Sequence, residues 1–145
     1  MLALAKAGRL DEAKAMASKM RSANDYRYVA QRGIALAHAK AGQFEQAIAF
    51  ARALDSATRD YTFRALIPLL IEAGRFDDAL ALGRALARDY ERAPAIATVG
   101  AGLLKADRKP AAAAVFREAV TVAAALPDGF FRAEGLVKIA LLLPR

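Results

Sequence analysis

The chain of 145 residues contains no cysteine, no tryptophan and only one histidine. Without cysteine it cannot form a disulfide framework, a thiolate metal site or a cysteine nucleophile. Three serines and the single His38 do not make a nucleophile with a base and an orienting group beside it. Because His38 also has no partners at metal-ligand spacing, we expect a protein that is not an enzyme and holds no metal or cofactor.

Long apolar runs are missing as well. The longest, 65–71 and 119–126, are much shorter than the roughly 18 residues that a membrane-spanning helix needs. The first residues, MLALAKAGR, have no basic region ahead of their apolar stretch and do not resemble a signal peptide. The sequence therefore predicts a cytoplasmic protein that does not insert into membranes.

Acidic residues are fewer than basic ones, and the formal net charge is +7. Such a charge favours acidic proteins, nucleic acid or anionic membranes as partners, because it attracts them over long distances. The same charge also keeps an alanine-rich protein in solution without any partner. Charge alone does not choose between these interpretations.

Alanine is the abundant residue, at 38 positions, whereas the nine glycines and five prolines together occupy 14. Alanine is the best helix former and has a small side chain, so this bias favours closely spaced helices. The β-branched and aromatic residues that strands prefer are sparse and scattered. The composition therefore predicts an all-α fold.

A six-residue motif recurs along the chain. It reads GRLDEA at 8–13, GQFEQA at 42–47 and GRFDDA at 74–79, and a degraded copy reads DRKPAA at 107–112. The copies begin at positions 8, 42, 74 and 107, so the steps are 34, 32 and 33 residues. A fixed period of this length is typical of proteins that stack helical pairs.

The chemistry of the motif predicts a corner between two helices. Gly8, Gly42 and Gly74 stand where one helix ends, because glycine adopts the left-handed conformation without a Cβ clash. The acidic pairs at 11–12 and 77–78 then lie in the first turn of the next helix, near the positive end of its dipole. We attribute these pairs to helix starts rather than to acid/base catalysis.

The apolar periodicity extends this motif into a helix map. It predicts a stub at 1–7 and helices over 10–22, 26–41, 44–55, 59–73, 76–88, 91–106, 109–126 and 129–143. Asp25, Asp60 and Asp128 are expected to cap the helices that begin near them. Pro110 can start a helix, whereas Pro68 lies inside one and should bend it by removing a backbone hydrogen bond.

Close helix packing is expected where small residues recur. Residues four apart lie on one helix face, and the expected buried pairs after the corners are Ala13/Ala17, Ala47/Ala51, Ala79/Gly83 and Ala112/Phe116. Gly100 and Gly102 lie inside a predicted helix and should permit close approach of a neighbour. We expect His38 to pack in a partly buried slot rather than to bind a ligand.

With this period, an aromatic two residues after the corner and an alanine three residues later, the chain resembles the tetratricopeptide repeat (TPR) family. The resemblance covers nearly the whole chain and rests on the three corner glycines and on Leu10, Phe44, Phe76, Ala13, Ala47 and Ala79. The aromatic that the family has four residues before the corner is replaced by Leu4, His38, Leu70 and Leu103. Pentatricopeptide-like arrays, which bind RNA, are an alternative.

The resemblance implies a right-handed α-solenoid of antiparallel helix hairpins, with about 3.5 to 4 repeats of about 33 residues. It implies a single repeat domain over 1–145, whose parts are a partial repeat 1–24, repeats 25–57, 58–90 and 91–127, and an unpaired terminal helix 128–145. Members of the family bind peptides in a concave groove that their first helices line. The implied function is a protein-interaction or scaffold module.

The resemblance also indicates which residues would line such a groove. They are Arg32, Lys40, Tyr61, Arg64, Lys105 and Arg132. Because the arginine fork suits carboxylates, an acidic peptide is the expected partner. The row is broken, since Ala97 and Glu72 replace a basic residue, and arginines that only pair with nearby acids would leave the same pattern.

Aromatic residues at the helix starts leave two interpretations open. They are Tyr26, Tyr61, Tyr90 and Phe130, with Arg27, Arg64, Arg92 and Arg132 near them in sequence. Such rings can stack bases of single-stranded RNA or DNA, which makes nucleic-acid binding the alternative function. They can equally hold one repeat against the next.

Both ends of the chain depart from the repeat. Residues 1–7 match only the second half of a first helix, and the helix at 130–143 has no following partner and is apolar on more than one side. Terminal repeats normally have a polar outer face. We therefore expect either a segment of a longer array or a homo-oligomer formed through exposed terminal helices. A segment of a larger repeat protein with no ligand of its own is a further alternative for the function.

Overall fold

The computed structural model describes residues 11, 15, 24–127 and 129–142. Within these ranges the regular elements are α-helices and there is no strand, so the all-α prediction is confirmed there. The helices are α3 (Asn24–Lys40), α4 (Phe44–Arg52), α5 (Ser56–Glu72), α6 (Phe76–Arg84), α7 (Asp89–Lys105), α8 (Lys109–Ala124) and α9 (Phe130–Leu142). The stub at 1–7, most of the helix at 10–22 and the corner at Gly8 lie outside the described residues.

The helices α3, α5 and α7 have the same length of 17 residues. Each ends two residues before its corner residue (Gly42, Gly74 or Asp107), and the next helix begins two residues after it. The motif therefore predicted these helix ends to within one residue. Pro68 lies inside α5, as expected, and the bend at this position stays a prediction.

The three corners share one backbone geometry. The corner residue has a positive φ of 76° at Gly42, 73° at Gly74 and 57° at Asp107. At the first corner, Gly42 N donates to Ala39 O at 3.0 Å and Gln43 N donates to His38 O at 2.9 Å, and both bonds recur at the other two corners. This pair of bonds is the Schellman motif, which satisfies the last helical carbonyls. The degraded copy thus forms the same corner, with Asp107 in place of glycine.

The predicted ends of α4 and α6 are wrong by three and four residues. These helices stop at Arg52 and Arg84 rather than at 55 and 88. After α6, the carbonyl of Leu86 accepts two hydrogen bonds from the guanidinium of Arg92, 3.2 and 3.0 Å long. Because a side chain satisfies this backbone oxygen, the chain can leave the helix before Leu86 at little cost.

The residue that caps α5 is Asp55, so the prediction of Asp60 is wrong. Thr58 N donates to Oδ1 of Asp55 at 3.1 Å, and Arg59 N donates to the Asp55 carbonyl at 2.8 Å. The bond from Thr58 lowers the pKa of the Asp55 carboxyl. The helix begins at Ser56, one turn earlier than predicted, so Asp60 lies within it. The side chains of the other two expected caps, Asp25 and Asp128, lie outside the described residues.

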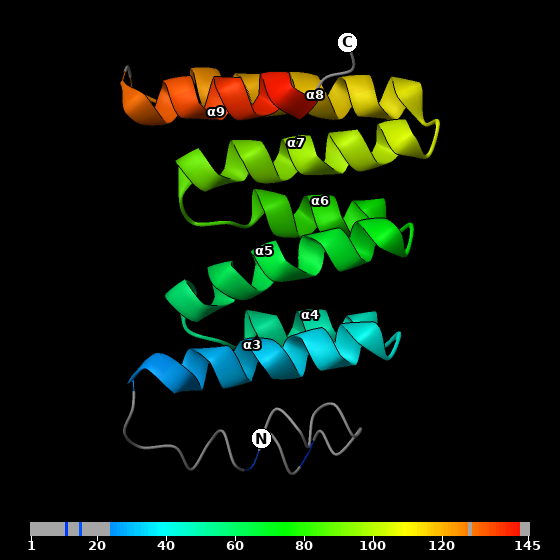
Figure 1. Cartoon of the computed structure of the whole chain (residues 1–145), viewed down its shortest axis with the longest axis vertical. Coiled ribbons are helices and arrows are strands. Elements are labelled where there is room, and N and C mark those ends of the chain that lie inside the picture. The colour runs from blue at the N-terminus through cyan, green and yellow to red at the C-terminus, as the bar shows by residue number, and fades with distance from the viewer. Residues whose placement is uncertain (1–10, 12–14, 16–23, 128, 143–145) are drawn as a thin grey trace. The chain divides into compact units, whose positions relative to one another are not determined.

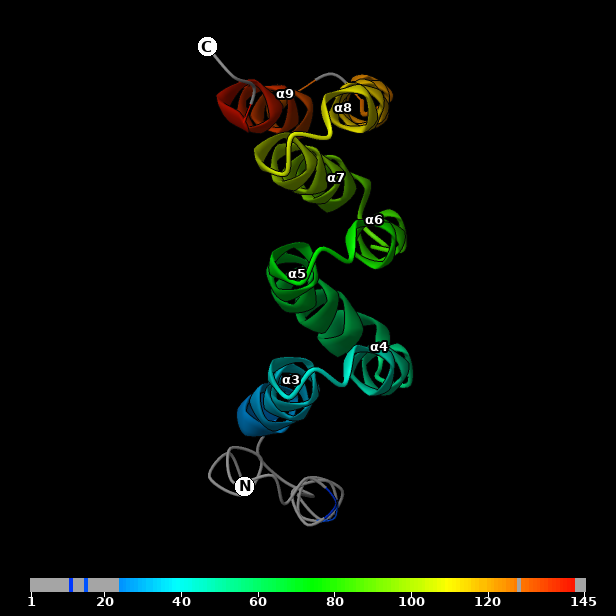
Figure 2. The same cartoon turned by 90° about the vertical axis from the view of Figure 1, so that its right-hand side faces the viewer.

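The chain divides into two compact units, residues 1–69 and 70–145. In the first unit, α3 packs against α4, and α5 follows in the chain (Figure 1). In the second unit, α7 packs against α6, α8 and α9, and α8 also contacts α9 (Figure 2). The helix α7 is therefore the centre of the second unit's core.

The expected buried pairs after the described corners are confirmed. They are Ala47/Ala51, Ala79/Gly83 and Ala112/Phe116. Close approach at the two helical glycines is also confirmed. A Cβ built on Gly100 would lie 3.2 Å from the Phe116 ring, and one built on Gly102 would lie 2.5 Å from Cγ2 of Ile71. Glycine at these two positions therefore lets α7 approach its neighbours.

Candidate partner-binding surfaces

His38 lies in the core, as expected. Its side chain is buried, and Nδ1 lies 2.7 Å from Oε1 of Gln43, the residue after the Gly42 corner. This hydrogen bond joins the end of α3 to the start of α4 and gives His38 a structural role. Among the described residues, no three His, Asp or Glu side chains come together as metal ligands, and no helix could cross a membrane.

Two tyrosines and an arginine form an exposed cluster in the first unit. The ring centroids of Tyr28 on α3 and Tyr61 on α5 are 6.4 Å apart, and the guanidinium carbon of Arg64 lies 5.8 Å from the Tyr61 centroid. Tyr61 and Arg64 share a helix face because they are three residues apart. The rings are 38% and 49% exposed, so much of their surface still faces solvent. We call Tyr28, Tyr61 and Arg64 the tyrosine–arginine cluster.

The structure places the other two predicted groove residues of this unit at different distances from the cluster. Arg32 is half-buried and lies one turn after Tyr28 on α3, so the two share a face. Lys40 is exposed at the end of α3, 12 residues from Tyr28 and so about 18 Å along the helix axis. Arg32 can therefore contribute to a surface at the cluster, whereas Lys40 cannot reach it.

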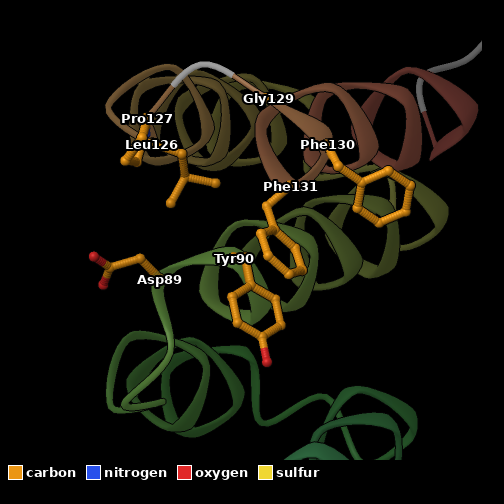
Figure 3. A pocket seen from close by; sticks show the side chains of 7 residues that line it. All are labelled: Asp89, Tyr90, Leu126, Pro127, Gly129, Phe130 and Phe131. Atoms are coloured by element: carbon orange, nitrogen blue, oxygen red, sulfur yellow. The ribbon is translucent and has the colours of Figure 1, made fainter.

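A pocket in the second unit lies beside three aromatic rings (Figure 3). Tyr90 on α7 stacks on Phe131 on α9, with centroids 4.5 Å apart and planes inclined by 23°. Phe130 meets Phe131 edge-on at 5.7 Å. The pocket has a volume of about 340 Å³ and is lined by Asp89, Tyr90, Leu126, Pro127, Gly129, Phe130 and Phe131. We call it the aromatic pocket.

The polar groups around the aromatic pocket are engaged with one another. Arg92 pairs with Asp89 at 2.9 Å in addition to its bonds with the Leu86 carbonyl. Arg88 donates to the Tyr90 hydroxyl at 3.1 Å. Arg92 therefore holds the backbone between α6 and α7. The interpretation of Tyr90 as a base-stacking ring with Arg92 beside it stays a prediction. The apolar walls of the pocket favour an apolar side chain as its occupant.

The remaining predicted groove residues, Lys105 and Arg132, lie at opposite ends of the second unit's long helices. Arg132 is half-buried and follows Phe131 in α9. Lys105 is exposed at the end of α7, 15 residues and so about 22 Å from Tyr90 along the helix axis. A row that joins Arg32 and Arg64 to Arg132 would involve both units and stays a prediction.

The described aromatic contacts join successive long helices. Tyr28 and Tyr61 connect α3 with α5, and Tyr90 and Phe131 connect α7 with α9. This agrees with the interpretation of the aromatics as contacts between repeats, while their exposure also leaves room for a ligand. The sequence reasoning missed Tyr28, although it stands 33 residues before Tyr61, which is one repeat step. The Tyr26 side chain lies outside the described residues.

A second set of arginines was also missed. Arg52, Arg84 and Arg117 each stand ten residues after a corner and are exposed on α4, α6 and α8. Arg84 makes two parallel bonds of 2.7 Å to the Glu118 carboxylate, which raises the pKa of Arg84 and lowers that of Glu118. Their constant separation of ten residues from the corner could have identified these arginines in the sequence. This pair fastens α6 to α8.

No family model, curated protein or solved structure matches the chain.

Proposed function

We propose that the chain is a protein-interaction module that binds an acidic peptide segment. In this proposal its helix pairs form a TPR-like solenoid, and the long helices α3, α5, α7 and α9 line the binding surface. The recurring corner geometry and the equal lengths of α3, α5 and α7 support the repeat. The tyrosine–arginine cluster is the observation that carries the binding proposal.

The cluster has the composition of a protein-binding hot spot. Tyrosine and arginine are, with tryptophan, the residue types most enriched in binding hot spots, because they combine apolar area with directional hydrogen bonds. At the cluster, Tyr28 and Tyr61 present half-exposed rings and hydroxyls, and Arg64 adds a planar cation beside them. A carboxylate bound by Arg64 and an apolar residue lying on the tyrosines would use both properties.

The net charge and the aromatic pocket support the same class of ligand. A charge of +7 accelerates association with acidic segments. The pocket of about 340 Å³ has room for one large apolar side chain between Leu126 and the Tyr90–Phe131 stack. The proposed ligand is therefore a peptide that combines Asp or Glu with aromatic or branched apolar residues.

Fluorescence anisotropy with labelled peptides tests this function. We expect a peptide of Asp, Glu, Phe and Leu to bind, and its counterpart with Asn and Gln in place of the acids to bind much more weakly. Arg64→Glu should weaken binding about 10- to 30-fold, as expected for a hot-spot residue. Arg117→Glu changes the net charge equally but lies on α8, so it should change affinity less than about twofold.

Two results would contradict the proposal. One is no binding of the acidic peptide at low salt, up to a concentration of about 1 mM. The other is an equal loss of affinity in Arg64→Glu and Arg117→Glu, because it would show that binding follows net charge and not the cluster.

Single-stranded nucleic acid is the second candidate, favoured by the same exposed rings. Bases can stack on Tyr28 and Tyr61 while Arg64 contacts a phosphate, and each stacked base contributes about 1–3 kcal/mol. Anisotropy with oligo-U and oligo-dT at increasing salt distinguishes the two functions. A nucleic-acid ligand would lose affinity steeply with added salt, whereas an apolar-anchored peptide would be less sensitive to salt. Tyr61→Ala should weaken both ligands, so the salt dependence and not this variant separates them.

A further inference from the structure

The chain offers one-electron oxidants few targets other than tyrosine. Cysteine and tryptophan compete with tyrosine for such oxidants and quench tyrosine radicals, and the chain contains neither residue. Its three methionines react by a different route, in which an oxygen atom is added to form the sulfoxide. One-electron oxidation therefore falls on the four tyrosines, and its product depends on which of them lie together.

Tyr28 and Tyr61 are in contact in the first unit. Their ring centroids are 6.4 Å apart, and the ring planes are inclined by 38°. Tyr28 lies on α3 and Tyr61 on α5, so the fold holds the two rings together although 33 positions separate them in the sequence. The two residues are 38% and 49% exposed, and an oxidant in solution can therefore reach both rings.

Tyr90, in the second unit, has different surroundings. It is half-buried, its ring stacks on Phe131 at 4.5 Å, and its hydroxyl accepts a hydrogen bond from Arg88. Phenylalanine is not oxidised under conditions that oxidise tyrosine. Among the described residues, a radical on Tyr90 therefore has no neighbouring ring with which to couple.

We propose that Tyr28 and Tyr61 form an oxidation site at which the two rings are joined as dityrosine. A one-electron oxidant, such as the ferryl haem that a peroxidase forms from hydrogen peroxide, removes an electron and the phenolic proton from each ring. The two radicals couple through ring carbons next to the carbons that bear the oxygens. Each coupled carbon then loses its hydrogen as a proton, and each oxygen regains one. The product has one new C–C bond and two hydrogen atoms fewer, while one peroxide is reduced to two waters.

Small movements of the two rings suffice for this bond. Their inclination of 38° resembles the twisted arrangement of two directly bonded aromatic rings. The centroids must come closer, and rotations of exposed side chains, which occur within picoseconds to nanoseconds, provide the movement. Two groups held in one molecule meet at an effective concentration of about 1 mM, so coupling within one chain is faster than coupling between dilute chains.

The new bond fastens α3 to α5. It closes a loop of 33 residues that includes α4, and a covalent link across such a loop stabilises a fold by restricting the unfolded chain. In a chain without cysteine, the tyrosine pair thus acts as a disulfide does in other proteins. The oxidation site is independent of peptide or nucleic-acid binding, because the coupling needs no ligand.

Peroxidase and hydrogen peroxide acting on the whole chain test the site. The chain is used at about 5 µM, far below the effective concentration within one molecule. Trypsin cuts after arginine and releases the peptides 28–32 and 60–64, each with one tyrosine. We expect mass spectrometry to find these two peptides linked, with two hydrogen atoms fewer than their sum, in chains that migrate as monomers. The linked chain should unfold about 5–15 °C higher than the untreated chain, followed by circular dichroism.

Three variants locate the reaction. Tyr28→Phe and Tyr61→Phe keep an aromatic ring at the contact but remove one phenol, so each should lose the linked peptides and the rise in unfolding temperature. Tyr90→Phe is the matched control and should form the link like the parent. Coupling of free N-acetyltyrosine in a parallel sample shows that the oxidant is active.

Three results would contradict the oxidation site. The first is that the peptides 28–32 and 60–64 stay unlinked in the parent while N-acetyltyrosine is coupled. The second is that Tyr61→Phe forms as much dityrosine within one chain as the parent does. The third is that the linked chain unfolds at the same temperature as the untreated chain, because the bond would then not fasten α3 to α5.

Discussion

Gly102→Ala gives the sharpest test of how α7 packs in the second unit. The added Cβ would lie 2.5 Å from Cγ2 of Ile71 and 3.4 Å from the Phe76 ring. The first distance is far below van der Waals contact, and Cγ2 belongs to a β-branched side chain that cannot rotate away freely. Overpacking of this kind costs about 1–3 kcal/mol, and the better helix propensity of alanine offsets about 1 kcal/mol. We expect a net loss of up to about 2 kcal/mol.

Gly83→Ala is the matched control on the neighbouring helix. A Cβ at this buried glycine of α6 would have its nearest neighbours at 3.6 Å, which is ordinary contact. The substitution should therefore stabilise the protein by about 0.5–1 kcal/mol through helix propensity. Urea unfolding followed by circular dichroism should show Gly83→Ala above the parent in stability and Gly102→Ala at or below it, about 0.5–3 kcal/mol apart.

A second substitution identifies the contact responsible. Ile71→Ala removes Cγ2, so Gly102→Ala should become neutral or stabilising in that background, with a coupling energy of about 1–3 kcal/mol. If Gly102→Ala is as stable as Gly83→Ala in the parent, or if its cost is the same with and without Ile71, the close approach of α7 to Ile71 is wrong.

Three further predictions concern the corners, a cap and an ion pair. Gly42→Ala should destabilise the folded protein by about 1 kcal/mol, because alanine would have to adopt a φ of 76°. Asp107→Gly should be neutral or stabilising in urea unfolding, because glycine adopts a φ of 57° without strain. Equal losses of stability in the two variants would contradict the shared corner geometry. Asp55→Ala should cost about 1 kcal/mol and Asp55→Asn much less, since asparagine can still accept the Thr58 N–H; equal losses would exclude the cap. The pKa of Glu118 is lowered in the folded state, so its contribution is present above about pH 4.3 and disappears as the pH falls through the lower folded pKa. Parent and Glu118→Gln should therefore differ by at most about 1 kcal/mol at pH 7 and converge below about pH 4 in pH-dependent unfolding; a constant difference would count against the Arg84 pair.

The corners and the buried faces could be read from the sequence because local chemistry decides them. Glycine tolerates a positive φ, so Gly42 and Gly74 mark helix ends whatever packs around them. Residues four apart lie on one helix face, so the buried pairs Ala47/Ala51 and Ala79/Gly83 were identified without coordinates. The type and register of the long helices follow from such local rules.

The ends of the shorter helices could not be read in this way. The side chain of Arg92 holds the Leu86 carbonyl from six residues further on, and Asp55 rather than Asp60 accepts the first N–H bond of α5. Propensity favours the helix on both sides of such points. The residue at which a helix ends or begins therefore depends on which side chain reaches the backbone there, and only the three-dimensional structure shows this.

For the candidate binding surfaces, too, the sequence determined some features and the tertiary structure determined others. Length, composition and period determined that the chain is helical, where its corners lie and which residue types are available for binding. Only the tertiary structure shows that Tyr28 contacts Tyr61 and that Tyr90 stacks on Phe131. It also shows that the Arg92 guanidinium donates hydrogen bonds to the Leu86 carbonyl. Phe130 and Val137 of α9 are exposed. The two residues of each aromatic pair are far apart in the sequence, by 33 positions for Tyr28 and Tyr61 and by 41 for Tyr90 and Phe131. Helix packing decides such contacts, because one shift of a helix by a single residue turns each side chain by about 100°.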